Sequence, residues 1–262
     1  MRIERLSCCS ISFLKQSRSD AMRHIAAAGF QKVDLIARAP HLSLDFDEVS
    51  PDSIEADARA SGLKIANLGT YCGQKFVSES AWEREEEFKA LVRAIDLAAR
   101  FGARSIRVMP GDNDPAKIDY LAEWFRRGAE HAASRQVYMG IENHGQRISG
   151  DPQRCRELAE KVGSPWFGVL YEPGNLHHAG VDYKRALETM KDCIVHVHFK
   201  DYGQTDSGLQ RVTLGTGEID FPWCLRRLGE IGYDGDIALE HEIKTEDPAL
   251  AIKGWLKTAL AW

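Results

Sequence analysis

The stretch Tyr138-Met-Gly-Ile-Glu142-Asn143-His144 begins with an apolar run that favours a β-strand and ends in a carboxylate, an amide and an imidazole. The same pattern recurs at 167–175 (FGVLYEPGN), 194–201 (IVHVHFKD) and 236–242 (DIALEHE). Carboxylates and imidazoles are common ligands of divalent metals. If the four strand ends meet at one point, three carboxylates and one histidine would surround a single ion.

Outward from these stretches, short apolar runs alternate with amphipathic ones along the whole chain. The predicted strands are Ile3–Cys9, Lys32–Ile36, Lys64–Leu68, Ser105–Met109, Tyr138–Glu142, Phe167–Tyr171, Ile194–Phe199 and Asp236–Glu240. The predicted helices cover roughly Ser19–Ala28, Pro51–Ser61, Ala81–Phe101, Pro115–Ser134, Asp151–Val162, Tyr183–Met190, Pro222–Ile231 and Pro248–Leu260. Glycines at positions 29, 62, 102, 163 and 232 follow helical patterns, where a left-handed C-cap favours glycine.

Eight strand–helix units in 262 residues match an α/β fold of the (β/α)8 TIM barrel type, with residues 1–262 as a single domain. A doubly wound sheet would need fewer units, and it would carry a Gly-rich phosphate loop after an early strand, which the sequence lacks. The longest loop, Lys200–Asp220, follows the seventh strand. It is rich in glycine and polar residues, so it is expected where the active-site loops of a barrel belong.

Composition weakens some classes of function without excluding them. The net charge of −5 gives no electrostatic attraction to nucleic acid or to an anionic membrane. The six cysteines show no CxxC spacing, which indicates scattered thiols in a reducing compartment. No apolar run reaches the roughly 18 residues that a membrane helix needs. The N-terminus makes a poor signal peptide, so a cytoplasmic location is expected.

The predicted strand ends place specific side chains in one pocket, because the C-terminal ends of barrel strands surround the active site. Glu142, Glu172, His198 and Glu240 end the fifth to eighth predicted strands. Carboxylate oxygen and imidazole nitrogen together suit one divalent ion such as Mn²⁺, Mg²⁺, Co²⁺ or Zn²⁺. Such an ion can polarise the carbonyl of a hydroxy-ketone. The neighbouring C–H then becomes acidic enough for a carboxylate to remove its proton.

Several longer motifs resemble the xylose-isomerase-like barrel superfamily. More narrowly, the chain resembles its sugar phosphate isomerase/epimerase group, which also includes inosose dehydratase, hydroxypyruvate isomerase and the ketose 3-epimerases. The resemblance spans nearly the whole chain. It is carried by Glu142-Asn143-His144, Pro173-Gly174-Asn175-Leu176 with Ala179-Gly180, His196-Val197-His198-Phe199-Lys200-Asp201, Gly215-Thr216-Gly217-Glu218-Ile219-Asp220, and Gly232-Tyr233-Asp234-Gly235 before Glu240.

This resemblance implies one metal ion held by a Glu, an Asp, a His and a Glu, and it implies that Glu142 and Glu240 are the catalytic acid and base. Glu142, His198 and Glu240 match three of the ligands. Glu172 stands where the family usually has aspartate, so this chain departs from the pattern there. The extra methylene moves the carboxylate by about 1.5 Å. That change could be absorbed by a rotamer, could lose the ligand, or could shift the metal preference.

Other side chains near these positions are candidates for substrate binding. They are His144, Asn175, His178, Lys200 and Arg211, and the assignment of Arg211 rests on the family alone. Each has a structural alternative, such as a loop hydrogen bond, an exposed position or an ion pair. His196 and Glu242 lie on the same side of their strands as His198 and Glu240, and they compete with them for the ligand role.

The leading hypothesis is a metal-dependent enzyme that isomerises, epimerises or dehydrates a small keto-sugar or polyol, since all three reactions begin with the same proton abstraction. One alternative is a DNA-repair hydrolase like endonuclease IV, which needs a multi-zinc cluster and a basic groove. The other is a non-catalytic sugar-binding barrel. The expected partner is a small-molecule sugar or polyol, without nucleic acid or membrane. A homodimer is the usual expectation for this class.

Overall fold

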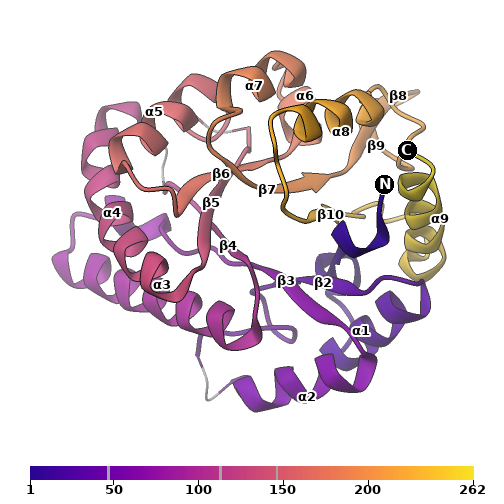
Figure 1. The fold of residues 1–262 in the computed structure, drawn as a ribbon, viewed down its shortest axis with the longest axis horizontal. Helices are drawn as coiled ribbons and strands as arrows, with labels where there is room; N and C mark the ends of the chain where they lie inside the picture. Colours follow the sequence, from indigo (N-terminus) through magenta and orange to yellow (C-terminus); the bar gives the residue numbers. More distant parts are fainter. Residues whose placement is uncertain (46–47, 112–113, 146) are drawn as a thin grey trace. The chain divides into compact units, whose positions relative to one another are not determined.

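The computed structural model describes residues 1–45, 48–111, 114–145 and 147–262. Within these residues, eight parallel strands form a closed barrel in the order β1-β10-β7-β6-β5-β4-β3-β2 (Figure 1). The barrel strands are β1 (Leu6–Cys9), β2 (Lys32–Ile36), β3 (Lys64–Gly69), β4 (Ser105–Val108), β5 (Tyr138–Glu142), β6 (Phe167–Tyr171), β7 (Ile194–Phe199) and β10 (Ile237–Leu239). Around the barrel they follow sequence order, which confirms the predicted (β/α)8 fold.

Helices connect successive strands. They are α1 (Arg18–Ala27), α2 (Pro51–Ser61), α3 (Ala81–Phe101), α4 (Ile118–Arg135), α5 (Pro152–Val162), α6 (Pro173–His178), α7 (Tyr183–Met190), α8 (Phe221–Glu230) and α9 (Pro248–Leu260). Short 3-10 segments are η1 (Ile3–Arg5), η2 (Ser10–Phe13), η3 (Gln74–Val77) and η4 (Pro115–Lys117). Gly29, Gly62, Gly102, Gly163 and Gly232 all have positive φ, as the sequence predicts for glycines that follow helices.

The chain divides into two compact parts, and residues 67–196 form one of them. In this part β4, β5 and β6 pair in parallel, with Ile141 opposite both Val108 and Val169. Helix α3 contacts α4, α4 contacts α5, and α5 contacts α7, so the helices cover one face of these strands (Figure 1). Gly168 is required in β6, because a Cβ there would lie 2.0 Å from the carbonyl oxygen of Cys193.

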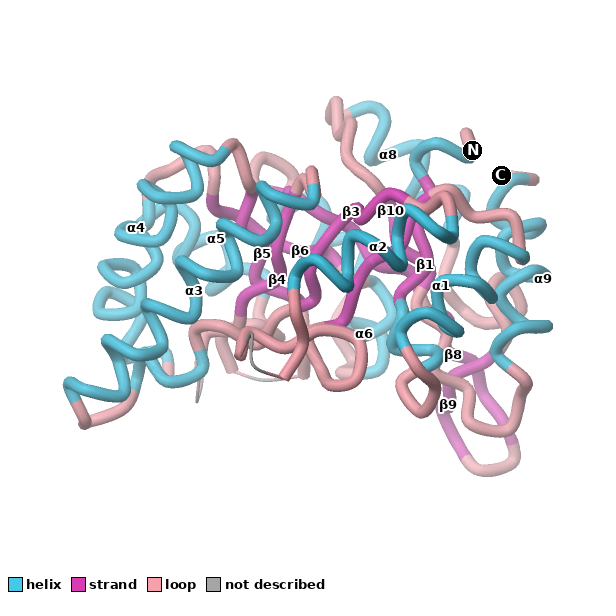
Figure 2. Tube along the Cα trace, turned by 90° about the horizontal axis from the view of Figure 1, so that it is seen from below, coloured by secondary structure: helices cyan, strands magenta, loops and turns pink. Residues whose placement is uncertain are grey.

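Residues 1–66 and 197–262 form the other part. Strand β1 pairs with β10 on one side and β2 on the other, and helix α1 contacts both α2 and α9. A two-stranded antiparallel hairpin, β8 (Asp201–Thr205) and β9 (Gly208–Val212), extends away from β1 and β10 (Figure 2). The single-domain prediction for residues 1–262 stays a prediction.

The structure corrects three local predictions. Residues Ile3–Arg5 form a 3-10 turn, so the first strand begins only at Leu6. The guanidinium of Arg5 donates to the carbonyl oxygens of Tyr233 and Gly235, which holds this turn against another segment rather than in the sheet. The predicted loop Lys200–Asp220 contains the hairpin β8–β9.

The third correction concerns the segment after the sixth strand, where no helix is predicted before Tyr183. Residues Pro173–His178 form helix α6 there, and it contains the predicted substrate contact His178. This helix forms because Pro173 occupies its first turn and the Glu172 side chain caps its N-terminus.

Candidate functional site

The ends of β7 and β10 bring His198 and Glu240 together. The two strands pair in parallel with Ala238 opposite His198, and the backbone N–H of Glu240 donates to the carbonyl of Phe199 at 3.0 Å. His198 Nδ1 lies 3.8 Å from Glu240 Oε2, and both side chains are buried. Two of the four predicted metal ligands therefore face each other from adjacent strands.

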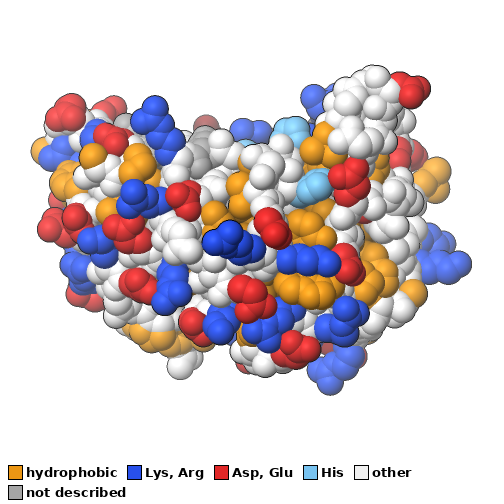
Figure 3. All heavy atoms as spheres, turned by 90° about the horizontal axis from the view of Figure 1, so that it is seen from above, with side chains coloured by type: hydrophobic (Ala, Val, Ile, Leu, Met, Phe, Trp, Pro, Cys, Tyr) orange, Lys and Arg blue, Asp and Glu red, His pale blue; other side chains and the backbone are white. Residues whose placement is uncertain are grey.

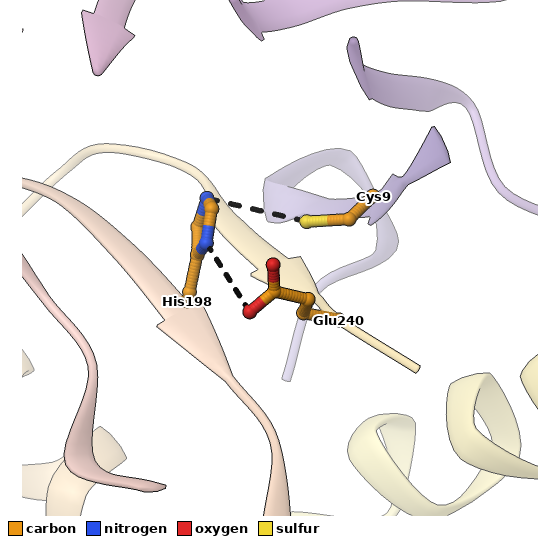
Figure 4. Close-up of side chains that lie close together, drawn as sticks. All are labelled: Cys9, His198 and Glu240. Carbon is orange, nitrogen blue, oxygen red and sulfur yellow. Dashed lines mark hydrogen bonds and ion pairs between the residues drawn. The ribbon is translucent and has the colours of Figure 1, made fainter. Parts of the chain in front are cut away.

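The other ring nitrogen of His198 faces β1 and β2. Nε2 lies 2.8 Å from Asp34 Oδ2 and 4.0 Å from Cys9 Sγ. Cys9 and Asp34 are partners in the parallel pairing of β1 with β2, so the register sets them side by side. Figure 4 shows the Cys9 thiol and the Glu240 carboxylate directed at opposite nitrogens of the same imidazole ring.

Lys200 connects this group to a second carboxylate. Its Nζ lies 2.6 Å from Glu240 Oε2 and 3.3 Å from Glu242 Oε2, and the lysine is only 3% exposed. Arg211, on the hairpin strand β9, reaches the same Glu242 oxygen at 3.1 Å. Cations and carboxylates therefore alternate from Arg211 to His198, which offsets the cost of burying Lys200 and Glu240.

These contacts shift the pKa values of the group. Burial alone would raise the pKa of Glu240, but Lys200 and His198 hold that pKa well below its ordinary value. Burial alone would lower the pKa of His198, but Cys9 and Asp34 raise it well above its ordinary value. Burial raises the pKa of the Cys9 thiol. These neighbours thus favour the charged forms of both Glu240 and His198.

The donor set fits a divalent ion. Cys9, His198 and Glu240 each offer one ligand atom, and these atoms lie within 4.8 Å of one another. The hydrogen bond from one ring nitrogen of His198 to Asp34 is the contact that orients metal-binding histidines in proteins. The other nitrogen is then directed toward Glu240. The imidazole nitrogen and the carboxylate oxygens that face each other suit a divalent transition metal.

In the part formed by residues 67–196, Glu142 ends strand β5 and pairs with Arg107 from β4. Arg107 Nη1 donates to Glu142 Oε2 at 2.8 Å, and both side chains are almost fully buried. The same guanidinium donates to the carbonyl oxygens of Gly69 and Thr70 and lies over the ring of Tyr71. Arg107 therefore balances the charge of Glu142 and fixes one of its carboxylate oxygens.

Glu172 caps the helix that follows it in the chain. Its Oε1 accepts from the backbone N–H of Gly174 at 2.7 Å, so this buried carboxylate caps helix α6. Asn175, also buried, donates from Nδ2 to the carbonyl of Asn143 at 2.9 Å, which ties α6 to the end of β5. The longer side chain that departs from the family pattern thus curls back onto its own helix.

The other predicted substrate contacts differ in exposure. His144 is exposed after β5, and its backbone N–H donates to the carbonyl of Ser149. His178 is exposed at the end of α6, whereas Lys200 is buried against Glu240. Arg211 is exposed on the hairpin and stays close to Tyr202.

The predicted ligands divide between the two parts of the chain. Glu142 and Glu172 belong to residues 67–196, and His198 and Glu240 belong to the other part. One four-residue metal site therefore stays a prediction from the sequence. What the structure adds is the group of Cys9, Asp34 and Lys200 around His198 and Glu240.

Three residues of these clusters were missed in the sequence: Cys9, Asp34 and Arg107. Asp34 and Arg107 each interrupt a short apolar strand, in KVDLI and SIRV respectively. A charge inside a strand that is buried along its length needs a partner, and that signal alone could have identified both. Cys9 carried no such signal, because a buried cysteine is ordinary. All six cysteines are free thiols, as expected, and five of them are buried.

A cavity of about 570 Å³ lies within the part that contains His198. It is lined by the segment after β1 (residues 11–16), by residues of the segment after β10 (241–244, 246 and 248) and by Arg211. Lys15 and Lys244 add two further cations to its wall. Its size suits a small molecule, and Glu242 connects it to Lys200.

In the described residues, no helix is long and apolar enough to cross a membrane.

Comparisons with known proteins agree on the fold. The family model described as xylose isomerase-like TIM barrel matches residues 22–262. The L-ribulose-5-phosphate 3-epimerase UlaE of Escherichia coli is 26% identical over 266 residues, covering 89% of this chain and 92% of the relative.

Two solved structures resemble the chain closely in fold. A xylose isomerase-like TIM barrel protein from Mycobacterium smegmatis in complex with magnesium matches with a TM-score of 0.82 and 16% identity, covering 98% of this chain and 96% of the other. The 3-keto-D-glucoside 4-epimerase YcjR from E. coli matches with a TM-score of 0.76 and 17% identity, covering 97% and 99%.

Proposed function

The chain belongs to the xylose isomerase-like TIM barrel family, and we propose that it is a divalent-metal-dependent isomerase or epimerase of a small keto-sugar. The observation that carries this proposal is the buried Glu240, which lies between Lys200 and a histidine already oriented by Asp34. Burying such a cluster costs free energy. Buried groups whose pKa values are strongly shifted are typical of functional sites. The similarity to UlaE supports a sugar epimerase as the reaction class.

A divalent ion bound here would polarise the substrate carbonyl and acidify the neighbouring C–H. We assign Glu142 and Glu240 to remove and return that proton. Lys200 holds one oxygen of Glu240, and Arg107 holds one oxygen of Glu142, so each carboxylate keeps a fixed direction. Removal on one face of the carbon and return on the other inverts its configuration, which is epimerisation.

The substrate is proposed to enter the cavity beside Glu242. Lys15, Arg211 and Lys244 on its wall would favour an anionic sugar such as a sugar phosphate. Over the face drawn in Figure 3, acidic and basic side chains are interspersed with apolar ones. That distribution, with the net charge of −5, supports a small-molecule partner rather than nucleic acid.

Solvent deuterium exchange tests the proposal directly. L-Ribulose 5-phosphate and unphosphorylated L-ribulose would be incubated with the Mn²⁺-loaded protein in heavy water, and label next to the carbonyl would be followed by NMR. Glu142→Gln and Glu240→Gln should each slow exchange by roughly 10²–10⁴-fold, because general acid–base catalysis contributes that much. Removing the metal with a chelator should abolish it.

A matched control is Glu86→Gln, since Glu86 is a partly exposed glutamate whose ion pair with Lys89 lies on helix α3. This variant should exchange at the wild-type rate. Unchanged exchange in both Glu142→Gln and Glu240→Gln would show that neither residue is the catalytic acid or base. Loss of water from the substrate would identify a dehydratase instead.

A further inference from the structure

Lys15 and Lys244 reach the wall of one cavity because β1 and β10 are neighbours in the barrel. The two strands pair in parallel, so the segments that follow them begin at the same end of the barrel. Lys15 lies between β1 and α1, Lys244 lies between β10 and α9, and these two helices contact each other. The fold therefore brings lysines from both ends of the chain to the cavity beside Glu242.

The carboxylates on the wall of this cavity already have partners. Glu242 Oε2 lies 3.3 Å from Lys200 Nζ and 3.1 Å from Arg211 Nη2. Glu246 Oε2 lies 3.0 Å from His241 Nε2. The arginine of the wall is thus held by Glu242, and neither glutamate is directed at the two lysines.

Lys15 and Lys244 have no such partner. In the part of the chain that the structure describes, neither lysine forms an ion pair with a carboxylate, and both side chains are exposed. The whole chain carries a net charge of −5, so two unpaired cations in one cavity run against its general charge. A cavity wall with charges of one sign concentrates ligands of the opposite sign. This wall therefore attracts an anion.

The kind of cation indicates the kind of anion. The planar guanidinium of an arginine matches a carboxylate with two parallel hydrogen bonds, whereas a lysine ammonium acts as a point charge and binds phosphate well. Two lysines match the roughly two negative charges of a phosphate monoester at neutral pH. Apolar side chains on the same wall, from Ile11, Leu14 and Ile243, suit the C–H groups of the carbon chain that carries the phosphate.

We propose that Lys15 and Lys244 form a subsite for the phosphate group of a phosphorylated keto-sugar, and that Arg211 instead holds Glu242 in place. The inference rests on the proposed function for the sugar, and it deepens that function by naming the residues that distinguish a phosphorylated sugar from a free one. No bond of the substrate is made or broken at this subsite, so its contribution is to binding.

Phosphate binding tests the subsite without turnover. Inorganic phosphate would be titrated with metal-free protein and followed by ³¹P NMR. Lys15→Met and Lys244→Met should each weaken binding by roughly tenfold, the low end for hydrogen bonds to charged groups, because both lysines are exposed. Arg211→Met should weaken it less than either lysine variant. Lys253→Met is the matched control, since this exposed lysine of helix α9 lies outside the cavity wall, and it should bind phosphate like the wild type.

Kinetics measure the same preference on the sugar. Each lysine variant should raise KM for L-ribulose 5-phosphate by roughly tenfold and leave kcat unchanged, because the lost contact binds substrate and transition state equally. The kinetic parameters for unphosphorylated L-ribulose should not change. A loss of kcat for both sugars would show that the lysines act on the reaction itself and would overturn their role as a phosphate subsite.

The outcomes separate this inference from the proposed function. Phosphate binding that is unchanged in the Lys15→Met, Lys244→Met double variant would overturn the subsite, and so would acetate that displaces phosphate at equal concentration. Deuterium exchange into L-ribulose by such a protein would leave the proposed function intact. Phosphate binding that the two lysine substitutions abolish, in a protein that exchanges no sugar proton, would support the subsite and refute the reaction.

Discussion

Replacing Arg107 with methionine should destabilise the protein by about 3–5 kcal/mol, because it removes the cation that faces a buried carboxylate. The pair is 2.8 Å apart, and its side chains are 6% and 2% exposed, so water cannot take over the lost interaction. Methionine keeps most of the volume of the arginine stem. The loss therefore reports on the charge and the hydrogen bonds of the guanidinium, which include those to the carbonyls of Gly69 and Thr70, rather than on a cavity.

Glu142→Gln should cost less, on the order of 1–2 kcal/mol. The amide oxygen of glutamine can still accept from Arg107 Nη1, and a neutral hydrogen bond is weaker than a charged one by about that amount. The double variant should lose less than the sum of the two single losses, by on the order of 1–3 kcal/mol, because the two residues act as a pair.

The assay is thermal and urea unfolding of metal-free protein followed by circular dichroism. For a chain of this size, each kcal/mol shifts the Tm by roughly 2–4 °C, so Arg107→Met should lower it by on the order of 10 °C. Arg23→Met is the control, since Arg23 pairs with Asp20 at an exposed position and should cost under about 1 kcal/mol. Two results would refute the coupling between Arg107 and Glu142. One is a loss of stability in Arg107→Met no larger than that in Arg23→Met, and the other is strict additivity in the double variant.

Three further outcomes are expected. Asp34→Asn should weaken metal binding by roughly 10–100-fold in a Zn²⁺ titration, because it disturbs the partner that orients the ligand imidazole; unchanged affinity would contradict this. Burial lowers the pKa of His41, so the unfolded state takes up a proton first as the pH falls below about 6.5. Stability should therefore rise with pH through the window below 6.5, and this slope should shrink in His41→Gln when unfolding is measured from pH 5 to 7.5. Asp201→Ala should cost about 1–3 kcal/mol and loosen the loop after the hairpin in hydrogen exchange, because the Asp201 carboxylate accepts from the backbone N–H groups of Gly215 and Gly217; full protection in the variant would exclude this role.

Regular elements were predictable from the sequence because their signals are local. Helices Pro51–Ser61, Ala81–Phe101 and Pro248–Leu260 have the predicted bounds, since proline or serine marks their starts. Strands Tyr138–Glu142 and Ile194–Phe199 also match, because short apolar runs of that length are typical of buried strands. The hairpin β8–β9 was missed because its residues are mostly polar, so its pairing leaves no apolar alternation.

The candidate site was predictable only where a strand ends in a conspicuous residue. Glu240 and His198 could be named from the sequence because they terminate or cross apolar runs in recognisable motifs. Their partners depend on which strands are neighbours. Asp34 lies 164 positions before His198 in the chain, yet it makes the hydrogen bond that sets the ring. No local pattern encodes a contact across that separation.

The register of strand pairing connects the local sequence pattern to the contacts between strands. Cys9 illustrates how strongly the site depends on it. Because side chains alternate along a strand, a shift of one residue in the pairing of β1 would turn the Cys8 thiol toward the cluster and the Cys9 thiol away. The observed pairing of Cys9 with Asp34 fixes which sulfur is available. The same alternation applied to the sequence would have left both cysteines open. Strand pairing, as much as residue identity, therefore decides which thiol lies beside His198.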